Sequence, residues 1–365
     1  MKSQNNLFSK ITFPLGTDPV ELGFAKLIAP GMYWIRMPLP FALNHINLWL
    51  LEDTFDGIVG WTLIDCGIDS PSNRDIWEKL ISTLLGGKPI LRIVVTHMHP
   101  DHIGNAHWLC KTFRAPLWMN STEFYAAHCA LVSDAGFGGP LAADFMKSHG
   151  LNSFEWLQAI QSRTTTYSQL VNSVPEQFVN VQDGDLIDIG GHKWLCIQGH
   201  GHSPEHISLY CEDLRVLISG DMLLPKISTN VSVWANEPLS NPVKQFLNSL
   251  RLFENLPEQT LVCPSHGIPF IGIHTRIREL GRHHDDRLDE VKQACAIKPQ
   301  SAYDITKLMF KRELDLHQIT FAMGEALAHL HWWWHEGILH RFKTQDNIYK
   351  FQTQALTPLK ITLKS

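Results

Sequence analysis

The chain has 365 residues, with 31 Lys and Arg against 36 Asp and Glu, so its formal net charge is −5. Charged residues make up 18% of the chain, below the roughly 25% of an average soluble domain, and hydrophobic residues make up 44%. This composition excludes a disordered chain, a collagen-like or coiled-coil rod, and a strongly basic surface that would attract a polyanion. The 20 histidines, almost as many as the 24 glycines, are the first feature to explain.

The amino-terminal residues and the seven cysteines favour a cytoplasmic protein. The first sixteen residues contain no apolar stretch typical of a signal peptide, and no run of about 18 apolar residues predicts a membrane helix. The cysteines are odd in number and never spaced C-x-x-C, which predicts reduced thiols rather than disulfides or a thiolate zinc site. We therefore expect a cytoplasmic location and no membrane partner.

Strand and helix patterns alternate along the first 120 residues. Strand patterns occupy residues 25–37, 45–51, 61–67 and 90–95. Between the last two, Ser70 and Pro71 open a helical pattern that ends near Gly86. This alternation predicts a layered α/β architecture.

The segment 121–180 differs, because it carries three helical patterns around a glycine-rich joint. The patterns occupy residues 122–132, 141–147 and 154–160, and the joint occupies 136–140. A helical insertion of this kind can be a lid over a site or a surface packing layer. The sequence leaves both interpretations open.

The second half of the chain resumes the alternation and then becomes helical. Strand patterns occupy 185–191, 192–199, 206–213, 215–221 and 260–267, and helical patterns occupy 241–255 and 275–295. Two further helices, 302–310 and 316–335, precede a hairpin pattern at 338–351, which is the outline of a winged helix. We therefore divide the chain into a catalytic domain, 1–285, and a small C-terminal winged-helix-like domain with its tail, 286–365.

One motif concentrates four metal-ligand side chains in six residues. His97, His99, Asp101 and His102 directly follow the strand pattern at 90–95. The two histidines at 97 and 99 can converge on one cation, whereas Asp101 and His102 lie where the chain turns into a helix and can face a second. Imidazole and carboxylate ligands without thiolate suit zinc first, with manganese or iron(II) as alternatives.

Three later residues repeat this placement after a strand pattern. They are His202 in GHGHSPEH, Asp221 in SGDML and His266 in CPSHG. A glycine beside each position lets the backbone fold closely around an ion, and strand ends are where sites collect in α/β sheets.

The ordered set resembles the metallo-β-lactamase superfamily. The matching positions are Asp65, His97, His99, Asp101, His102, His202, Asp221 and His266, and the resemblance covers roughly residues 25–285. It implies an αββα sandwich with a site for two divalent metal ions at one edge. It also implies an enzyme, a metal-dependent hydrolase.

The resemblance implies a role for each matching residue. His97, His99 and His202 would hold the first metal. Asp101, His102 and His266 would hold the second, with Asp221 bridging. Asp65 would lie behind the ligands and orient one of them, and we place His206 there too. A metal-bridging hydroxide would attack the substrate, and Asp101 is the expected catalytic residue because it can orient the nucleophile and carry a proton.

At three positions the sequence differs from particular branches of the superfamily, and these differences limit the reactions that we expect. Asp221 stands where many true β-lactamases have cysteine, His99 where flavodiiron proteins have glutamate, and Leu224 where lactonases often have tyrosine. The metal site is similar to that of glyoxalase II. We expect cleavage of an ester-type bond in a small-molecule substrate, with thioester first and lactone next. The alternatives are a metal-dependent nuclease or phosphodiesterase and a mononuclear iron persulfide dioxygenase.

The C-terminal domain gives little sign of nucleic-acid binding. Residues 286–365 contain 11 basic and 9 acidic side chains, and the second helix carries Trp332, Trp333 and Trp334 rather than a basic face. Three consecutive tryptophans cannot share one helix face, so this helix is a candidate surface for homo-oligomerisation. His283 and His284 are expected on a solvated helix face.

Overall fold

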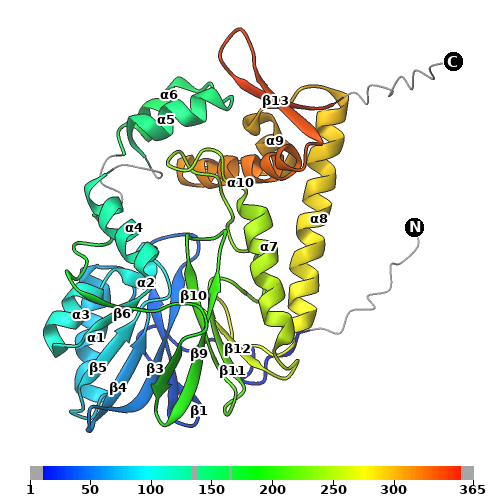
Figure 1. Ribbon diagram of the computed structural model, residues 1–365. Helices are drawn as coiled ribbons and strands as arrows, with labels where there is room; N and C mark the ends of the chain where they lie inside the picture. The colour runs from blue at the N-terminus through cyan, green and yellow to red at the C-terminus, as the bar shows by residue number, and fades with distance from the viewer. Residues whose placement is uncertain (1–10, 134–137, 164–166, 355–365) are drawn as a thin grey trace.

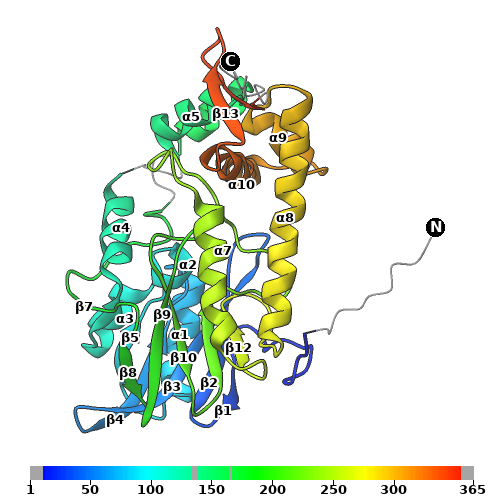
Figure 2. The same ribbon diagram turned by 45° about the vertical axis from the view of Figure 1, so that its right-hand side comes forward.

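The computed structural model of the chain describes residues 11–133, 138–163 and 167–354. Within these ranges, a seven-stranded and a five-stranded β-sheet pack face to face, and helices cover both outer faces (Figure 1). This is the αββα sandwich expected from the sequence. A further group of helices with a two-stranded ribbon lies across one end of the sandwich (Figure 2).

The two sheets follow the chain in order. The larger sheet comprises β1 (Ala25–Ala29), β2 (Met32–Pro38), β3 (His45–Phe55), β4 (Ile58–Ile64), β5 (Ile90–Val94), β6 (Leu117–Met119) and β7 (Phe178–Asn180), paired in that order. The smaller sheet comprises β8 (Leu186–Ile189), β9 (His192–Gly199), β10 (His206–Cys211), β11 (Val216–Gly220) and β12 (Leu261–Pro264), with the order β12-β11-β10-β9-β8.

The helices divide between the two faces and the end of the sandwich. The helices beside the larger sheet are α1 (Pro71–Thr83), α2 (Pro100–Ile103) and α3 (Ala106–Phe113). Between β6 and β7 lie α4 (Ser121–Val132), α5 (Gly139–Ser148) and α6 (Phe154–Gln161). The remaining elements are α7 (Pro242–Leu252), α8 (Ile273–Ile297), α9 (Ala302–Met309), α10 (Leu316–His335), β13 (Leu339–Lys343) and β14 (Tyr349–Thr353).

Strand β3 shows how the sequence builds the layers. Its side chains alternate between the two faces of the sheet, so Trp49 joins the core between the sheets, where it meets Trp194 from β9. Leu48 and Leu50 point the other way and pack under α1 with Trp77. Because both faces are covered there, the central run Leu48–Leu51 is continuously apolar, as is usual for a strand inside a sandwich.

The larger sheet extends further than the sequence predicted. The three helices expected within 121–180 are present, but the segment is flanked by β6 and β7, which pair in parallel. Strands of three residues have too short a pattern to be recognised, and their pairing is decided by tertiary contacts. Part of the glycine-rich joint at 136–140 lies outside the described residues.

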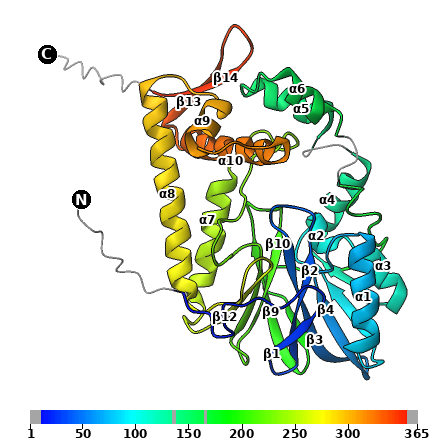
Figure 3. The ribbon, with the colours of Figure 1, turned by 180° about the vertical axis from the view of Figure 1, so that it is seen from behind.

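The C-terminal elements share a core with the sandwich helices. Leu327 and Leu330 of α10 belong to the same buried cluster as Phe246 and Leu250 of α7. Helix α8 runs without interruption across the boundary predicted at 285/286, from the sheet to the C-terminal ribbon (Figure 3). The division into domains 1–285 and 286–365 therefore stays a prediction. Among the described residues, no helix is both long and apolar enough to cross a bilayer.

The expectation of a solvated position for His284 was wrong. His284 is buried and its ring stacks on His329 at 5.3 Å, so it does not lie on a solvated face. The three tryptophans are half-buried, and each of two has an intramolecular partner: Trp333 Nε1 donates to the Leu288 carbonyl, and Arg341 lies over the Trp334 ring. Homo-oligomerisation through this helix stays a prediction.

A buried ion pair within the larger sheet, at the end of β3, also bonds to the smaller sheet. The Asp53 carboxylate lies 2.8 Å from the Arg92 guanidinium, and both side chains are almost completely buried. Asp53 also accepts from Thr62 Oγ1 within its own sheet and from Gly190 N, at 2.9 Å, in the opposite sheet. The carboxylate thus has donors on every side, which offsets the cost of burying it.

We expect Arg92→Met to lower the free energy of unfolding by about 3–5 kcal/mol, because it leaves the buried Asp53 charge without its partner. Lys193→Met is the control, since Lys193 pairs with Asp188 on the exposed surface, where such a pair contributes about 0–1 kcal/mol. Urea denaturation of both variants measures the difference. Equal losses would show that the Asp53–Arg92 pair contributes no more than a surface pair.

Candidate metal centre

The motif residues all lie at one end of the sandwich, where strands end. His97 and His99 occupy the loop after β5, and Pro100 then starts the short helix α2, which carries Asp101 and His102. His202 lies between β9 and β10, Asp221 directly follows β11 and His266 follows β12. The seven residues predicted as metal ligands thus come from four separate segments of the chain.

The structure brings these seven side chains together. Three sets of ligand atoms each lie within 4.8 Å of one another: His97, His99 and His202; His97, His102 and Asp221; and Asp101, His102 and His266. Two of these sets are the groups expected to hold the first and the second metal.

Asp221 faces both groups with different oxygens. Its Oδ2 lies 3.2 Å from His202 Nε2, whereas its Oδ1 lies 3.4 Å from His266 Nε2 and 3.7 Å from His102 Nε2. Two ligand atoms that each lie about 2.0–2.2 Å from one cation are separated from each other by roughly these oxygen–nitrogen distances. The arrangement suits a carboxylate that bridges two cations.

Two buried atoms of this cluster support a metal site. Within the described part of the chain, His102 Nε2 and Asp221 Oδ1 are buried and accept or donate no hydrogen bond. Such atoms are rare in folded proteins, because each costs the free energy of removing a polar group from water. A divalent cation at each group would give both atoms a partner, so the residues fit the expected metals.

The second nitrogen of three imidazoles is held by an acceptor. Nδ1 of His102 lies 2.7 Å from Asp65 Oδ2, while Asp65 Oδ1 accepts from Thr96 N. Nδ1 of His202 donates to the Asn230 carbonyl at 2.9 Å, and Nδ1 of His266 donates to the His45 carbonyl at 2.8 Å. Each bond leaves Nε2 directed into the cluster, which is the usual orientation of a metal-binding histidine.

His206 lies behind Asp221. It is completely buried, and its Nε2 accepts a hydrogen bond from the Asp221 backbone N at 3.2 Å. Gly220 has a φ of +55°, and a Cβ there would approach the His206 ring to 2.1 Å, so the position requires glycine. Asp65 and His206 each contact a residue of the cluster, and their roles behind the metal ligands stay predictions.

The charge states of the cluster follow from burial and neighbouring charges. Burial, together with the neighbouring imidazoles, holds the pKa of His97 well below its usual value, so this ring is neutral and has a lone pair to offer. Burial acts to lower the pKa of His266 as well, but the carboxylates of Asp221 and Asp101 raise it to about 10. In the absence of cations, a proton on His266 thus compensates the acidic side chains.

The match to known proteins agrees with the geometry. Residues 44–266 match the family model for the metallo-beta-lactamase superfamily, and residues 288–354 match the model for a metallo-beta-lactamase-like C-terminal domain. The chain belongs to the metallo-beta-lactamase superfamily.

Three similar proteins place it within this superfamily. A crystal structure of a beta-lactamase domain protein from Burkholderia ambifaria is 46% identical, covers 94% of this chain and 98% of its own, and has a TM-score of 0.89. The "Probable metallo-hydrolase YqjP" of Bacillus subtilis is 25% identical over 81% of this chain and 90% of its own length. The acyl-coenzyme A thioesterase MBLAC2 of Bos taurus is 26% identical over 54% of this chain and 65% of its own length.

Membership confirms the resemblance seen in the sequence and the enzyme class. The chain is a metal-dependent hydrolase of the metallo-beta-lactamase superfamily, whose members use divalent metals. The order of two helices and a ribbon expected after residue 300 is present, but the resemblance to a winged helix stays a prediction.

A buried carboxylate that no sequence pattern marked connects two of the loops that carry predicted ligands. Glu123, in the first turn of α4, is completely buried and accepts three hydrogen bonds. Its Oε2 accepts from Met98 N at 2.9 Å, between His97 and His99, and its Oε1 accepts from Ser203 Oγ at 2.7 Å and Glu205 N at 2.6 Å, beside His202. Glutamate in a first helical turn is common, so no pattern marked this residue.

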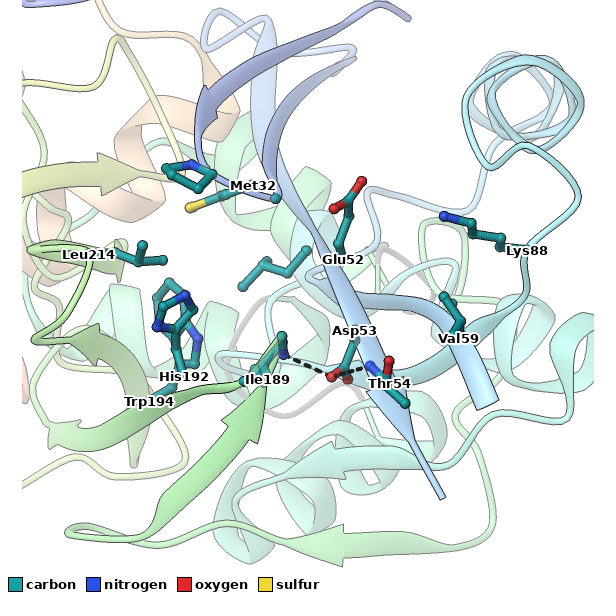
Figure 4. A pocket seen from close by; sticks show the side chains of 16 residues that line it. Met32, Glu52, Asp53, Thr54, Val59, Lys88, Ile189, His192, Trp194 and Leu214 are labelled. Atoms are coloured by element: carbon teal, nitrogen blue, oxygen red, sulfur yellow. Dashed lines mark hydrogen bonds between the residues drawn. The ribbon is translucent and has the colours of Figure 1, made fainter. Parts of the chain in front are cut away.

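A cavity of about 390 Å³ lies away from the cluster of predicted metal ligands. It is at the opposite end of β3 and β9: β9 runs from His192 at the cavity to Gly199 beside the ligand loops. Figure 4 shows the Asp53 carboxylate at its wall, bonded to the backbone of Thr54 and of the turn after Ile189. These groups already hold the sheets together, so we place substrate chemistry at the metal end.

We expect Glu123→Gln to weaken metal binding or turnover roughly 10–100-fold, the usual effect of removing a group that supports metal ligands. Its amide must turn an N–H₂ towards a backbone or hydroxyl donor, so at least one of the three bonds is lost. Glu205→Gln is the control, because that side chain accepts from the Thr122 hydroxyl, which an amide oxygen can still do. Chelator competition and steady-state kinetics compare the two. Identical metal affinity and turnover in both variants would remove Glu123 from the site.

Proposed function

We propose that this superfamily member is a dinuclear hydrolase of ester-type bonds, with a thioester as its substrate class and a lactone next. The observation that carries the dinuclear part is the orientation of Asp221, whose two oxygens face two separate ligand groups. His97, His99 and His202 would hold one cation, and Asp101, His102 and His266 the other. Zinc is the first choice for the metal because five of the seven ligands are imidazoles.

The exposure of the ligands indicates the side from which substrate approaches. His97 and His102 are fully buried, whereas His99, Asp101 and His202 are partly exposed. When bound, two divalent cations lower the pKa of water and polarise a carbonyl oxygen. The chain's own residues then orient the reactants at the exposed side of the cluster.

Asp101 has the contacts expected of the proton carrier. Its Oδ2 lies 3.3 Å from His266 Nε2 and 3.6 Å from His102 Nε2, and its side chain keeps 18% of its surface exposed. A carboxylate in this position can accept a hydrogen bond from a water molecule and pass a proton to the leaving group. Thiolate is a good leaving group that needs little protonation, which suits a site with one partly exposed acid.

The substrate class rests on similarity and charge. The MBLAC2 relative is named an acyl-coenzyme A thioesterase. A nuclease or phosphodiesterase needs basic side chains around the metals, and Arg276, beside the loop that follows Asp221, is already bound to the carbonyls of Leu224 and Ile227 and to Glu279. These observations favour an acyl group, rather than a phosphodiester, as the group that reacts at the metals.

The purified protein should contain two divalent ions per chain and hydrolyse thioesters faster than other substrates. The decisive experiment combines metal analysis with turnover of a panel of thioesters, lactones, bis-p-nitrophenyl phosphate and RNA. Preferential cleavage of RNA or the phosphodiester would replace the proposal by the nuclease alternative. One iron per chain without zinc, together with oxygen consumption on a persulfide, would replace it by the dioxygenase.

We expect Asp101→Asn and His99→Ala to abolish turnover while the protein still folds. Asp101→Asn removes a negative ligand and the proton acceptor, whereas His99→Ala removes one ligand of the other cation. Circular dichroism establishes the fold and steady-state kinetics the loss. Asp144→Asn, on α5, is the control for a change of charge away from the cluster. Near-wild-type turnover in either ligand variant would overturn the site assignment.

A further inference from the structure

A long loop connects the metal site to the C-terminal helix α10. Residues 221–241 join β11 to α7 without helix or strand, and loops of this length inside a compact fold usually have a function. At the site end, Thr229 Oγ1 donates to the Asp221 carbonyl, and the Asn230 carbonyl accepts from His202 Nδ1. The loop therefore supplies the acceptor that orients a predicted ligand.

The first half of this loop is held by the sandwich. Arg276 of α8 is buried, and its guanidinium donates to the carbonyls of Leu224 at 2.6 Å and Ile227 at 2.9 Å. These bonds end three residues before Asn230. The second half, which carries Asn230, is held from the other side.

That other side is α10, which lies across the end of the sandwich in Figures 1 and 2. Ser232 Oγ lies within hydrogen-bond distance of two acceptors, Asn230 Oδ1 at 2.8 Å and the Phe321 carbonyl of α10 at 3.3 Å. Val233 N donates to the Gly324 carbonyl at 3.1 Å. One turn of α10 thus fixes the loop two residues after Asn230.

Later turns of α10 hold the end of the same loop. His331 Nδ1 donates to the Ser240 carbonyl at 2.8 Å, and His335 Nε2 to the Leu239 carbonyl at 2.9 Å. Four contacts along one helix therefore hold the loop between Asn230 and α7.

The contact is closest at Gly324, in the middle of α10. A Cβ at this position would lie 2.8 Å from Ser232 Cβ and 3.3 Å from the Val233 carbonyl oxygen. Glycine inside a helix is unfavourable relative to alanine, so its presence here fits the close approach of helix and loop. Any larger residue must displace Ser232, and with it the segment that carries Asn230.

We infer that α10 is a positioning element for the metal site: through Gly324 and Ser232 it holds the Asn230 carbonyl in place, and that carbonyl orients His202 towards the cation. The inference rests on the proposed assignment of His202 as a ligand. It gives the C-terminal segment a role in metal binding that packing alone would not require. The coupling is reciprocal, so a bound cation should in turn stabilise the docking of α10.

Gly324→Ala tests this with Gly281→Ala as the matched control. Both glycines lie inside helices, but a Cβ at Gly281 meets no atom within 4 Å. Zn²⁺ affinity and stoichiometry are measured by chelator competition on the full-length protein, and the melting temperature of the metal-free protein is measured alongside. We expect roughly tenfold weaker binding of one of the two ions in Gly324→Ala and no change in Gly281→Ala.

A second variant avoids the steric clash. Ser232→Ala removes the hydroxyl but keeps the Cβ, so it can fold where Gly324→Ala does not, and we expect it to weaken the same ion by a smaller factor. Hydrogen exchange of residues 321–332 should slow on addition of Zn²⁺ to the wild type and slow less in Ser232→Ala. Unchanged affinity in both variants, or a lower melting temperature of the metal-free protein with unchanged affinity, would overturn the inference.

His202→Ala separates this inference from the proposed function. If it loses one ion while Gly324→Ala and Ser232→Ala keep both at wild-type affinity, only the role of α10 fails. If His202→Ala itself keeps two ions at wild-type affinity, the ligand assignment fails and the inference fails with it. Loss of the same ion in all three variants supports both.

Discussion

The orientation of each imidazole is the constraint on which this site depends. An imidazole presents a lone pair to a cation only when its other nitrogen carries the proton, and a free ring can rotate or exchange the two. Here the Asp65 carboxylate fixes His102, the Asn230 carbonyl fixes His202, and the His45 carbonyl fixes His266. The three acceptors belong to the start of β3, to the residue after β4 and to the long loop after β11.

This dispersal explains why the site needs the complete sandwich. His45 begins β3 of the larger sheet, whereas His266 follows β12 of the smaller one, so their bond closes the end of the sandwich. Glu123 adds a second connection, between the loop after β5 and the loop after β9. The loops that carry His97, His202 and His266 are thus held by residues from other elements, so the positions of these predicted ligands depend on how the two sheets pack.

The sequence identified the side chains that the structure brings together better than it identified the groups that support them. His97, His99, Asp101 and His102 form a short pattern, and the later ligands each follow a recognisable strand. Asn230 and His45 act through backbone carbonyls, which every residue has, so no side-chain pattern can identify them. Strands β6 and β7 were missed because three residues are too few for a period. His284 was wrongly expected on a solvated face. It is buried because α10 packs against α8, and this packing depends on contacts between distant segments of the chain.

The buried cluster shared by α7, α8 and α10 also sets an order of events during synthesis. Phe246 of α7 leaves the ribosome about 80 residues before Leu327 and Leu330 of α10, which at 5–20 residues per second is an interval of about 4–16 s. During the later part of that interval, once His266 and then α8 have been made, every predicted metal ligand is outside the ribosome, yet α10 does not yet cover the apolar faces of α7 and α8. Until its last helix is made, the nascent chain therefore exposes these apolar faces, which is the condition under which partly folded chains aggregate.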